Sequence, residues 1–413
     1  MKERPLPAEP DSRGTASTTV LRGARLIDGI TAEAQTGFDV IVEGDRITAV
    51  EPSDPARVLP PEARVIDASG ATLLPGLIDC HAHYTIDPTV EDGFLLYNAE
   101  RIEQLVLRAA GMARRALEAG VTTARSGGSP ANLDVVLSAA IAAGHVAGPR
   151  LMAAGPALTI TGGHGYQFGR EVDGELEFIR AVRANVRDGA EVIKIVSSEA
   201  AMITTAVAGV EEVSAAELEA VVREAHRLHR RVLSHAQNSE SVRRSARAGV
   251  ASVEHAFLAD EAALETLVEH GTTLVPTLTV TAVWHDLVDL SPAARARQDE
   301  IERLHRRSCE TAIRIGVEVA TGTDTGVRGV MPEMLWREVV LLHDHGASAM
   351  QAIKAATSTA AKLLGIEDQV GTIEPGKVAD LILVDGDPSQ DLGRLARPRV
   401  VMHAGRLVPL GGD

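Results

Sequence analysis

The chain has 413 residues, of which 45% are hydrophobic and 24% are charged, and its formal net charge is −16 at pH 7. These proportions lie close to the averages of globular proteins, so wholesale disorder is excluded. The acidic balance argues against a protein that binds nucleic acid through a basic face, and the sequence contains no run of about 18 apolar residues that would predict a transmembrane helix.

Both ends of the chain carry a β pattern. Residues 1–18 are polar and rich in proline, which predicts a flexible N-terminal tail. Short β-branched segments separated by turn residues fill residues 19–75, and the same pattern returns in residues 376–413. We expect these two regions to pair into one small β-sandwich domain.

The middle of the chain, residues 76–375, alternates between apolar strand-like runs and helical runs. Such alternation is typical of a parallel sheet covered by helices. Apolar residues recur at helical spacing between Leu105 and Ala116, and Ser214 to Glu217 has the pattern of a capping box. Eight candidate strands over about 250 to 300 residues predict an α/β fold, a closed (β/α)8 barrel. The candidates are Gly76–Tyr84, Val121–Ser126, Arg150–Ala154, Val192–Val196, Arg231–His235, Ser252–His255, Thr273–Pro276 and Val317–Thr321.

The strongest signal for chemistry is a pair of histidines, His81 and His83, near the end of the first candidate strand. Residues i and i+2 of a strand face the same side, and active sites of such barrels lie at the carboxyl ends of the strands. Two converging imidazoles suit a divalent metal ion. The alternative is a pair of surface histidines that follow a buried strand.

Four further polar residues occupy corresponding positions on other candidate strands. Lys194 interrupts an apolar run, where an unpaired lysine is rare, His235 and His255 end two strands, and Asp324 follows the eighth. Six residues that reach the same end of one barrel by coincidence are improbable. The pattern therefore predicts a metal site there.

On these residues the chain resembles the amidohydrolase superfamily, whose members carry a binuclear metal centre in a distorted barrel. The resemblance covers nearly the whole chain and includes the segments LLPGLIDCHAH (73–83), TSTAAKLLGI (357–366) and GTIEPGKVADLILVDGDP (371–388). The segment TGGHG (161–165) indicates the imidazolonepropionase-related branch, which contains Xaa-Pro dipeptidases.

The resemblance implies a cofactor of two divalent metal ions. Zinc is expected, with manganese or cobalt as alternatives, because imidazole and carboxylate ligands serve all three. The implied ligands are His81, His83 and Asp324 for one ion, His235 and His255 for the second, and Lys194, carboxylated by carbon dioxide, as a bridge between the two. A free lysine is a cation that repels a metal, whereas its carbamate is an anion. An unmodified buried lysine paired with an acid is the alternative.

The resemblance also implies catalytic roles. A hydroxide that bridges the metals would attack the substrate, because a metal lowers the pKa of bound water from about 15.7 to about 7. Asp324 would serve as general base and then general acid. His164 would hydrogen-bond the substrate carbonyl or the oxyanion that forms from it, and its alternative is a loop histidine without a role.

Two positions depart from the pattern of the family. Peptidase relatives usually carry a tyrosine that binds the substrate carboxylate where this chain has Gln237, and an aspartate after the strand-2 arginine where this chain has Ser126. Neither change touches a metal ligand. We expect Gln237 to contact the substrate, and the departures put in doubt a substrate that ends in a free amino-acid carboxylate.

The sequence therefore predicts a metal-dependent hydrolase of C–N bonds in an amide, acyl-amino acid or dipeptide, carbamate, urea or cyclic amide. One alternative is a lactonase or phosphotriesterase that uses the same metal centre, and another is a non-catalytic scaffold. We expect a small-molecule substrate, no nucleic-acid or membrane partner, and a homo-oligomer. Only two cysteines, Cys80 and Cys309, are present, which fits a reducing, cytoplasmic location.

Overall fold

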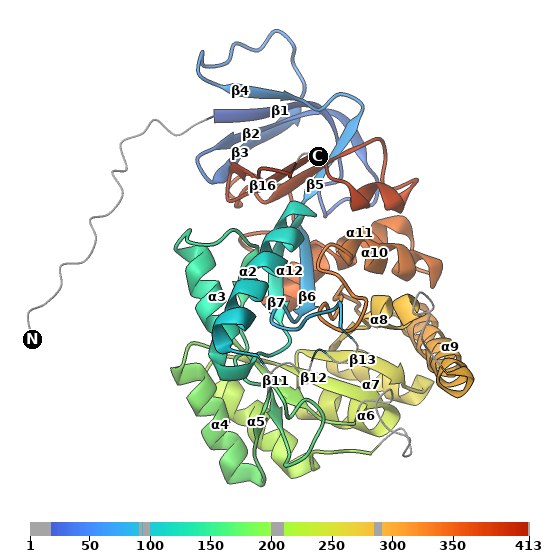
Figure 1. The fold of residues 1–413 in the computed structure, drawn as a ribbon. Coiled ribbons are helices and arrows are strands. Elements are labelled where there is room, and N and C mark those ends of the chain that lie inside the picture. The colour runs from blue at the N-terminus through green and yellow to red at the C-terminus, as the bar shows by residue number, and fades with distance from the viewer. Residues whose placement is uncertain (1–17, 91–92, 94–99, 200–209, 285–290, 412–413) are drawn as a thin grey trace, which may run out of the picture.

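The structure is a computed structural model that describes residues 18–90, 93, 100–199, 210–284 and 291–411. A β domain lies at one end of the molecule and a barrel surrounded by helices fills the rest (Figure 1). The predicted N-terminal tail lies outside the described residues except for Thr18, which begins the first strand.

The β domain is built from strands at both ends of the chain. They are β1 (Thr18–Leu26), β2 (Gln35–Glu43), β3 (Arg46–Pro52), β4 (Arg64–Asp67), β5 (Ala71–Pro75), β15 (Leu381–Asp385), β16 (Val400–His403) and β17 (Arg406–Leu407). They form a single hydrogen-bonded sheet in the order β17-β16-β15-β5-β1-β2-β3, with β4 also paired to β1. Strand β5 runs antiparallel to β15, and the Thr72 hydroxyl donates to the carbonyl of Gly386, 314 residues further along the chain.

The barrel contains seven of the eight predicted strands as regular strands. They are β6 (Leu77–Ala82), β7 (Val121–Ser126), β8 (Arg150–Met152), β11 (Val192–Val196), β12 (Arg231–Asn238), β13 (Ser252–Leu258) and β14 (Thr273–Val275). Neighbouring strands pair in parallel within two groups, β6-β7-β8 and β11-β12-β13-β14. The groups are joined where the amide of Val192 donates to the carbonyl of Ala153. Two short strands, β9 (Leu158–Thr159) and β10 (Arg170–Glu171), extend the second group.

The eighth candidate, Val317–Thr321, is not a regular strand, and the sequence prediction is corrected there. Only Val319 forms a bridge, to Leu274 of β14. The segment still closes the barrel, because the amide of Cys80 on β6 donates to the carbonyl of Thr321. The amide of Thr321 donates to the carbonyl of Ala355 in α11 instead of to a neighbouring strand, and its hydroxyl donates to the carbonyl of Ile78 on β6.

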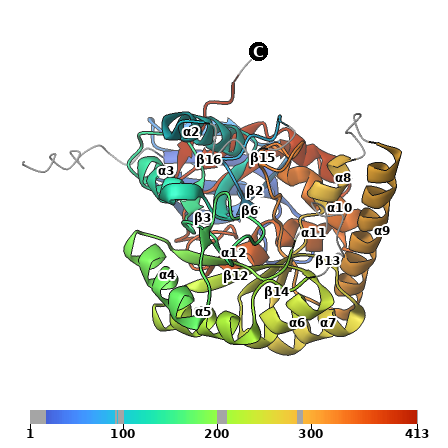
Figure 2. The same cartoon turned by 60° about the horizontal axis from the view of Figure 1, so that its bottom comes forward.

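Helices cover the outside of the barrel (Figure 2). The spacing predicted around Leu105 is confirmed, since α2 buries Leu105, Ala109, Met112 and Ala116. The predicted capping box at Ser214 opens α5, where the Ser214 side chain accepts from the amide of Glu217. The helices are α2 (Ile102–Glu118), α3 (Leu133–Ala142), α4 (Glu175–Arg187), α5 (Ala215–Arg227), α6 (Ser239–Ala248), α7 (Glu261–His270), α8 (Leu278–Val283), α9 (Pro292–Ile315), α10 (Leu335–Asp344), α11 (Ala349–Ala355) and α12 (Ser358–Leu364), with short 3-10 turns at Pro130–Asn132 and Leu392–Ala396.

Side-chain alternation along the barrel strands separates the core from the site. Ile193 and Ile195 of β11 face outward and pack in one apolar cluster with residues of α4 and α5, and each buried aliphatic side chain contributes about 1.5–3 kcal/mol. Lys194 lies between them and therefore faces the barrel interior.

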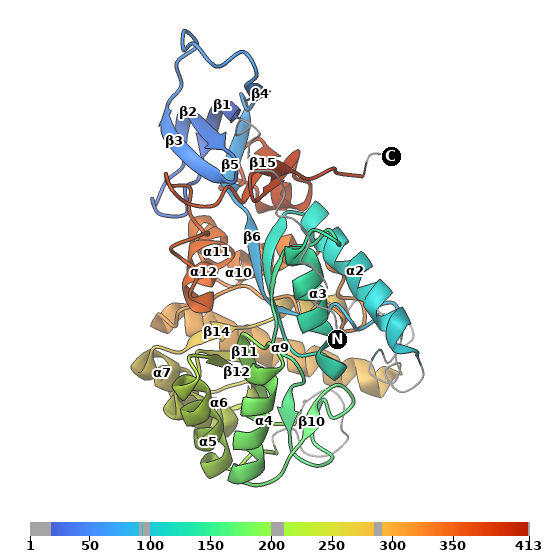
Figure 3. The ribbon, with the colours of Figure 1, turned by 90° about the vertical axis from the view of Figure 1, so that its left-hand side faces the viewer.

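No helix of the described residues has the length and apolarity needed to cross a bilayer. Figure 3 shows β6 running from the β domain into the barrel, so the first site strand continues directly from β5.

Candidate metal centre

The side chains of His81, His83 and Asp324 converge at the carboxyl end of the barrel strands. The Nε2 atoms of the two histidines are 3.3 Å apart, and each lies 3.4 Å from Asp324 Oδ1. The Lys194 amine is 3.3 Å from His81 Nε2. His255 completes the group, because one ligand atom each from His81, His255 and Asp324 lie within 4.8 Å of one another. The HxH spacing thus places both histidines on one side of β6, as strand geometry requires.

In three histidines, Nδ1 points away from the site and makes a hydrogen bond. These bonds fix Nε2 as the nitrogen that faces the site. His83 Nδ1 donates to the carbonyl of Gly128 at 3.1 Å. His255 Nδ1 lies 2.8 Å from Thr277 Oγ1, and that hydroxyl donates to the carbonyl of Pro276, so it accepts from His255. His81 Nδ1 lies 2.8 Å from a carboxylate oxygen of Glu254. The Nε2 lone pairs of neutral rings therefore face inward, which is the arrangement of metal-ligating histidines.

Burial and neighbouring charges shift the pKa values of four groups in the centre. Burial, reinforced by the charge of Lys194, lowers the pKa of His81 to about 4, and burial lowers the pKa of His255 well below its usual value. Burial alone would raise the pKa of Asp324, but His81, His83 and Lys194 hold it far below its usual range. Burial lowers the pKa of Lys194 to about 8. Near neutral pH, His81 and His255 therefore present imidazole lone pairs and Asp324 presents a carboxylate.

His235 and His164 border this group. The rings of His235 and His255 are 4.6 Å apart, and those of His164 and His235 are 4.7 Å apart. His235 Nε2 is buried and has no hydrogen-bond partner among the described residues. Leaving such a group unsatisfied costs about 1–3 kcal/mol. The loop histidine predicted from TGGHG therefore reaches the same site as the strand histidines.

A glycine makes room for the centre. A Cβ atom placed on Gly127, just after β7, would lie 2.5 Å from His83 Nε2 and 2.7 Å from His81 Nε2. The two ring nitrogens can approach the backbone of residue 127 this closely only because that residue has no side chain. An unpartnered buried nitrogen, a glycine at which any Cβ atom would overlap two inward-facing nitrogens and a set of imidazole and carboxylate donors all fit a divalent metal ion.

Several of these residues have unusual backbone conformations. His255, Thr277 and Asp324 have positive φ angles of 75°, 55° and 59°. For residues with a Cβ atom this region is strained by about 1–3 kcal/mol and is concentrated at functional sites. The strained turn at Asp324 is fixed by its amide, which donates to the carbonyl of His81 at 2.8 Å.

Gln237 lies two residues beyond His235 at the end of β12, and its side chain is buried. Its backbone N–H donates to Ser198 Oγ at 3.0 Å. The loop that carries His164 is held by Glu212, whose two oxygens accept the amide of His164 at 2.8 and 3.0 Å. Burial, together with the charge of Glu199, raises the pKa of Glu212 to about 7.

The sequence prediction missed a buried ion pair beneath the centre. Arg125 and Glu254 form it at 2.9 Å, and both are almost completely inaccessible to solvent. Burial opposes the ionisation of Glu254, but Arg125 and the hydrogen bond with His81 lower its pKa to about 2. The available signal was a charged residue within an apolar strand, the reasoning that identified Lys194.

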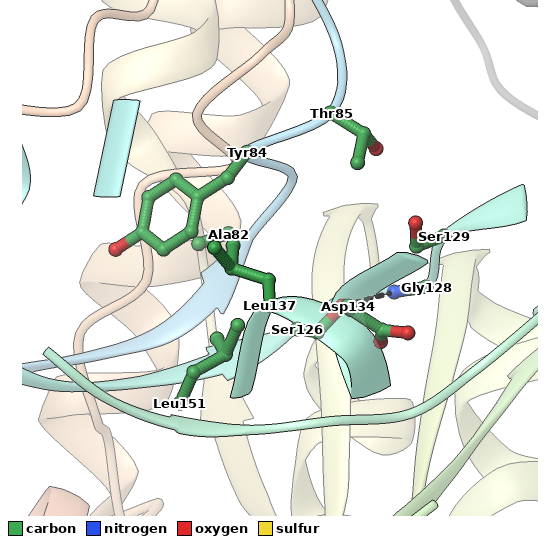
Figure 4. Close-up of a pocket in the computed structure, with 9 residues that line it drawn as sticks. All are labelled: Ala82, Tyr84, Thr85, Ser126, Gly128, Ser129, Asp134, Leu137 and Leu151. Atoms are coloured by element: carbon green, nitrogen blue, oxygen red, sulfur yellow. Dashed lines mark hydrogen bonds between the residues drawn. The ribbon is translucent and has the colours of Figure 1, made fainter. Parts of the chain in front are cut away.

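A small cavity lies on the other side of β6 and β7. Ala82 and Tyr84 line it, whereas His81 and His83 alternate with them and face the barrel interior. Figure 4 shows the cavity and the hydrogen bond from the amide of Gly128 to Ser126 Oγ. Asp134 at its edge accepts the amides of Ala154 and Gly155. The cavity is thus separate from the candidate metal centre.

Comparison with known proteins gives the family. The model of the amidohydrolase family matches residues 72–408. A solved Xaa-Pro dipeptidase with methionine bound in its active site is 31% identical, with a TM-score of 0.86, and the match covers 95% of this chain and 100% of that one.

Two curated relatives agree with this result. Ochratoxinase of Aspergillus niger is 29% identical over 362 residues, which cover 80% of this chain and 74% of the relative. Imidazolonepropionase of Symbiobacterium thermophilum is 28% identical over 407 residues, which cover 88% and 86%. The chain belongs to the amidohydrolase family and is a hydrolytic enzyme that acts on carbon–nitrogen bonds, as the sequence predicts.

Proposed function

We propose that this member of the amidohydrolase family hydrolyses amide-type C–N bonds of a small molecule with the help of two divalent metal ions. One observation carries the proposal: His81 Nε2, His83 Nε2 and Asp324 Oδ1, all electron-pair donors, lie within 3.4 Å of one another. Such lone pairs repel one another unless a cation lies between them.

The metal ligands would be the residues that the sequence predicts. We assign one ion to His81, His83 and Asp324 and the other to His235 and His255, and zinc is the first candidate for both. When bound, the ions would lower the pKa of water to about 7 and polarise the substrate carbonyl. Assignment of His235 to the second ion accounts for its buried, unpartnered Nε2.

Lys194 would bridge the two ions as its carbamate. Its amine lies 3.3 Å from His81 Nε2, in the middle of the imidazoles, where an ammonium group would repel a metal ion. Because burial lowers the pKa of the amine to about 8, the neutral form that reacts with carbon dioxide is accessible. Carboxylation replaces the positive charge with a negative one.

Two residues would act directly on the substrate. Asp324 would take the proton of the attacking water and pass it to the leaving nitrogen, as general base and then general acid. His164, whose ring lies 4.7 Å from that of His235, would donate a hydrogen bond to the carbonyl oxygen. Burial and the charge of Lys194 lower the pKa of His164 to about 4, so its neutral ring would be the donor.

Two residues, Gln237 and Glu212, carry the argument for the substrate class. Gln237 offers a neutral amide in place of the tyrosine of peptidase relatives, and Glu212 places a carboxyl group behind the His164 loop. Both features favour neutral amides, carbamates or ureas over acyl-amino acids with a free carboxylate. The relatives named Xaa-Pro dipeptidase, ochratoxinase and imidazolonepropionase support a C–N bond as the target.

A cytoplasmic location and a homo-oligomeric state complete the proposal, with no nucleic-acid or membrane partner. Both cysteines, Cys80 and Cys309, are buried free thiols in the structure, which suits a reducing compartment. Exposed apolar side chains such as Leu107 and Leu176 are candidates for contacts between subunits. Light scattering on the purified protein would give the oligomeric state.

Metal analysis combined with a substrate panel tests the proposal. We expect about two divalent ions per chain, and amide hydrolysis that chelation abolishes and zinc restores. His81→Asn should lose metal and activity together. His226→Asn, a change of the same type at an exposed position on α5, is the matched control and should retain both.

Two results would contradict the proposal. Full activity and metal content in His81→Asn would remove the strand-1 ligands from the site. Faster turnover of lactones or phosphotriesters than of amides, carbamates and ureas would show that the target bond is wrong while leaving the metal centre intact.

A further inference from the structure

The interior of the barrel beneath the metal centre contains an arginine that reaches across to another strand. Arg125 lies on β7, and its guanidinium contacts β6 and β13. Its Nε donates to the carbonyl of Cys80 at 2.6 Å, one terminal nitrogen to Ser252 Oγ at 3.0 Å and the other to Glu254 at 2.9 Å. Only 1% of Arg125 is exposed, so its charge has no access to water.

Glu254 completes this network and connects it to the metal centre. One carboxylate oxygen accepts from Arg125 and from Ser252 Oγ, the latter at 2.5 Å. The other oxygen lies 2.8 Å from His81 Nδ1. An ionised carboxylate only accepts hydrogen bonds, so the proton of the His81 ring resides on Nδ1. The lone pair on Nε2 is then left for the centre.

We propose that Glu254, oriented by Arg125, is a positioning residue that holds His81 as the Nδ1–H tautomer with Nε2 aimed at the metal centre. This inference rests on the metal centre proposed above. Hydrogen-bond partners of this kind fix ring orientation and increase the basicity of the ligand nitrogen, and their loss lowers metal affinity about 10- to 100-fold.

His81 differs from the other histidines of the centre in this respect. His83 donates to a backbone carbonyl and His255 to a hydroxyl, both of which are uncharged. Among the three, only His81 has a carboxylate partner at Nδ1, and that carboxylate is followed directly in the chain by His255. Glu254 therefore links a ligand of the first proposed ion to a ligand of the second.

A matched pair of double variants separates the hydrogen bond from the ion pair. R125M/E254Q and R125M/E254M both remove the two buried charges, a replacement that is often tolerated. They differ in one acceptor, because the Gln carbonyl still accepts from His81 Nδ1 and Met does not. We expect R125M/E254M to bind zinc about 10- to 100-fold more weakly than R125M/E254Q in competition with a chromophoric chelator. The melting temperatures of the two metal-free variants should agree within a few degrees.

The outcomes are distinct. Equal zinc affinities in the two variants would refute the positioning role, whereas a wild-type protein that binds no divalent ion would refute the metal centre itself.

A second measurement uses the wild-type zinc protein and requires no buried substitution. With ¹⁵N-labelled histidine, NMR should show a proton on Nδ1 of His81, assigned by its absence in His81→Asn. An unprotonated His81 Nδ1 would overturn the inference.

Discussion

Replacement of Gly127 by alanine tests the close approach of His81 and His83 to this glycine with the smallest possible change. The φ angle of Gly127 is not in the positive region, so alanine adds no backbone strain there. The only addition is one methyl group. We expect Gly127→Ala to fold normally and to lose both metal affinity and activity.

The structure sets the size of the effect. The new Cβ atom would lie 2.5 Å from His83 Nε2 and 2.7 Å from His81 Nε2, whereas carbon atoms in contact are about 3.5–4.0 Å apart. The methyl group or the rings must therefore move by about 1 Å. A misplacement of that size costs about 100-fold in rate, or about 2.7 kcal/mol of transition-state stabilisation.

The assay compares metal content after dialysis, kcat/KM and the melting temperature. Gly111→Ala is the matched control, because a Cβ at that position on α2 would have nothing within 4 Å. In the helix it should raise stability by about 0.5–1 kcal/mol and leave activity unchanged. A Gly127→Ala enzyme with full metal content and full activity would show that the metals do not lie in front of these two nitrogens.

Three further predictions concern the residues around the centre. Lys194→Ala should lose most activity and be partly rescued by acetate, and reactivation of metal-stripped wild type should require bicarbonate; a mass that shows an unmodified lysine beside two bound ions would contradict the carbamate. Glu212 has a pKa raised from 4.5 to about 7, so the folded protein holds this proton more tightly than the unfolded chain and loses stability as the pH rises from about 4.5 to 7. In chemical denaturation over this pH range, the free energy of unfolding of Glu212→Gln should fall by about 1–3 kcal/mol less than that of the wild type. An unchanged pH profile would show that Glu212 does not have the raised pKa. Neutral amides, carbamates or ureas should be turned over at least as well as acyl-amino acids, and Gln237→Tyr should shift the preference toward the latter; a 100-fold advantage of acyl-amino acids in the wild type, about 2.7 kcal/mol, would mean that another residue binds the carboxylate.

The sequence is sufficient to predict the fold and the site wherever a repeating backbone geometry connects the position of a residue to the direction of its side chain. The period of two in β6 and β11 predicts that His81, His83 and Lys194 face the inside of the barrel, and the order of the strands predicts His255 and Asp324 beside them. The capping box at Ser214 is a local pattern that requires no tertiary information. These features depend on neighbours in the chain, which a sequence displays directly.

Other features depend on contacts across the barrel, and these could not be predicted. Arg125 and Glu254 lie on strands that are not adjacent in the sheet, so no spacing in the sequence connects them. Gly127 tolerates no Cβ atom only because two rings on another strand approach it. The amide of Thr321 bonds to Ala355 in a helix instead of to a neighbouring strand, and a β-branched run does not reveal that contact.

The pairing of β5 with β15 has a consequence for synthesis of the protein. At about 5–20 residues per second, β5 leaves the ribosome roughly 15–60 seconds before β15, the strand that pairs with it in the finished sheet. The amino-terminal strands must wait through translation of the entire barrel with an unpaired edge, the kind of surface on which chains associate. The sheet can therefore close only after the barrel has been translated, and a chain cut short anywhere in the barrel would retain that exposed edge.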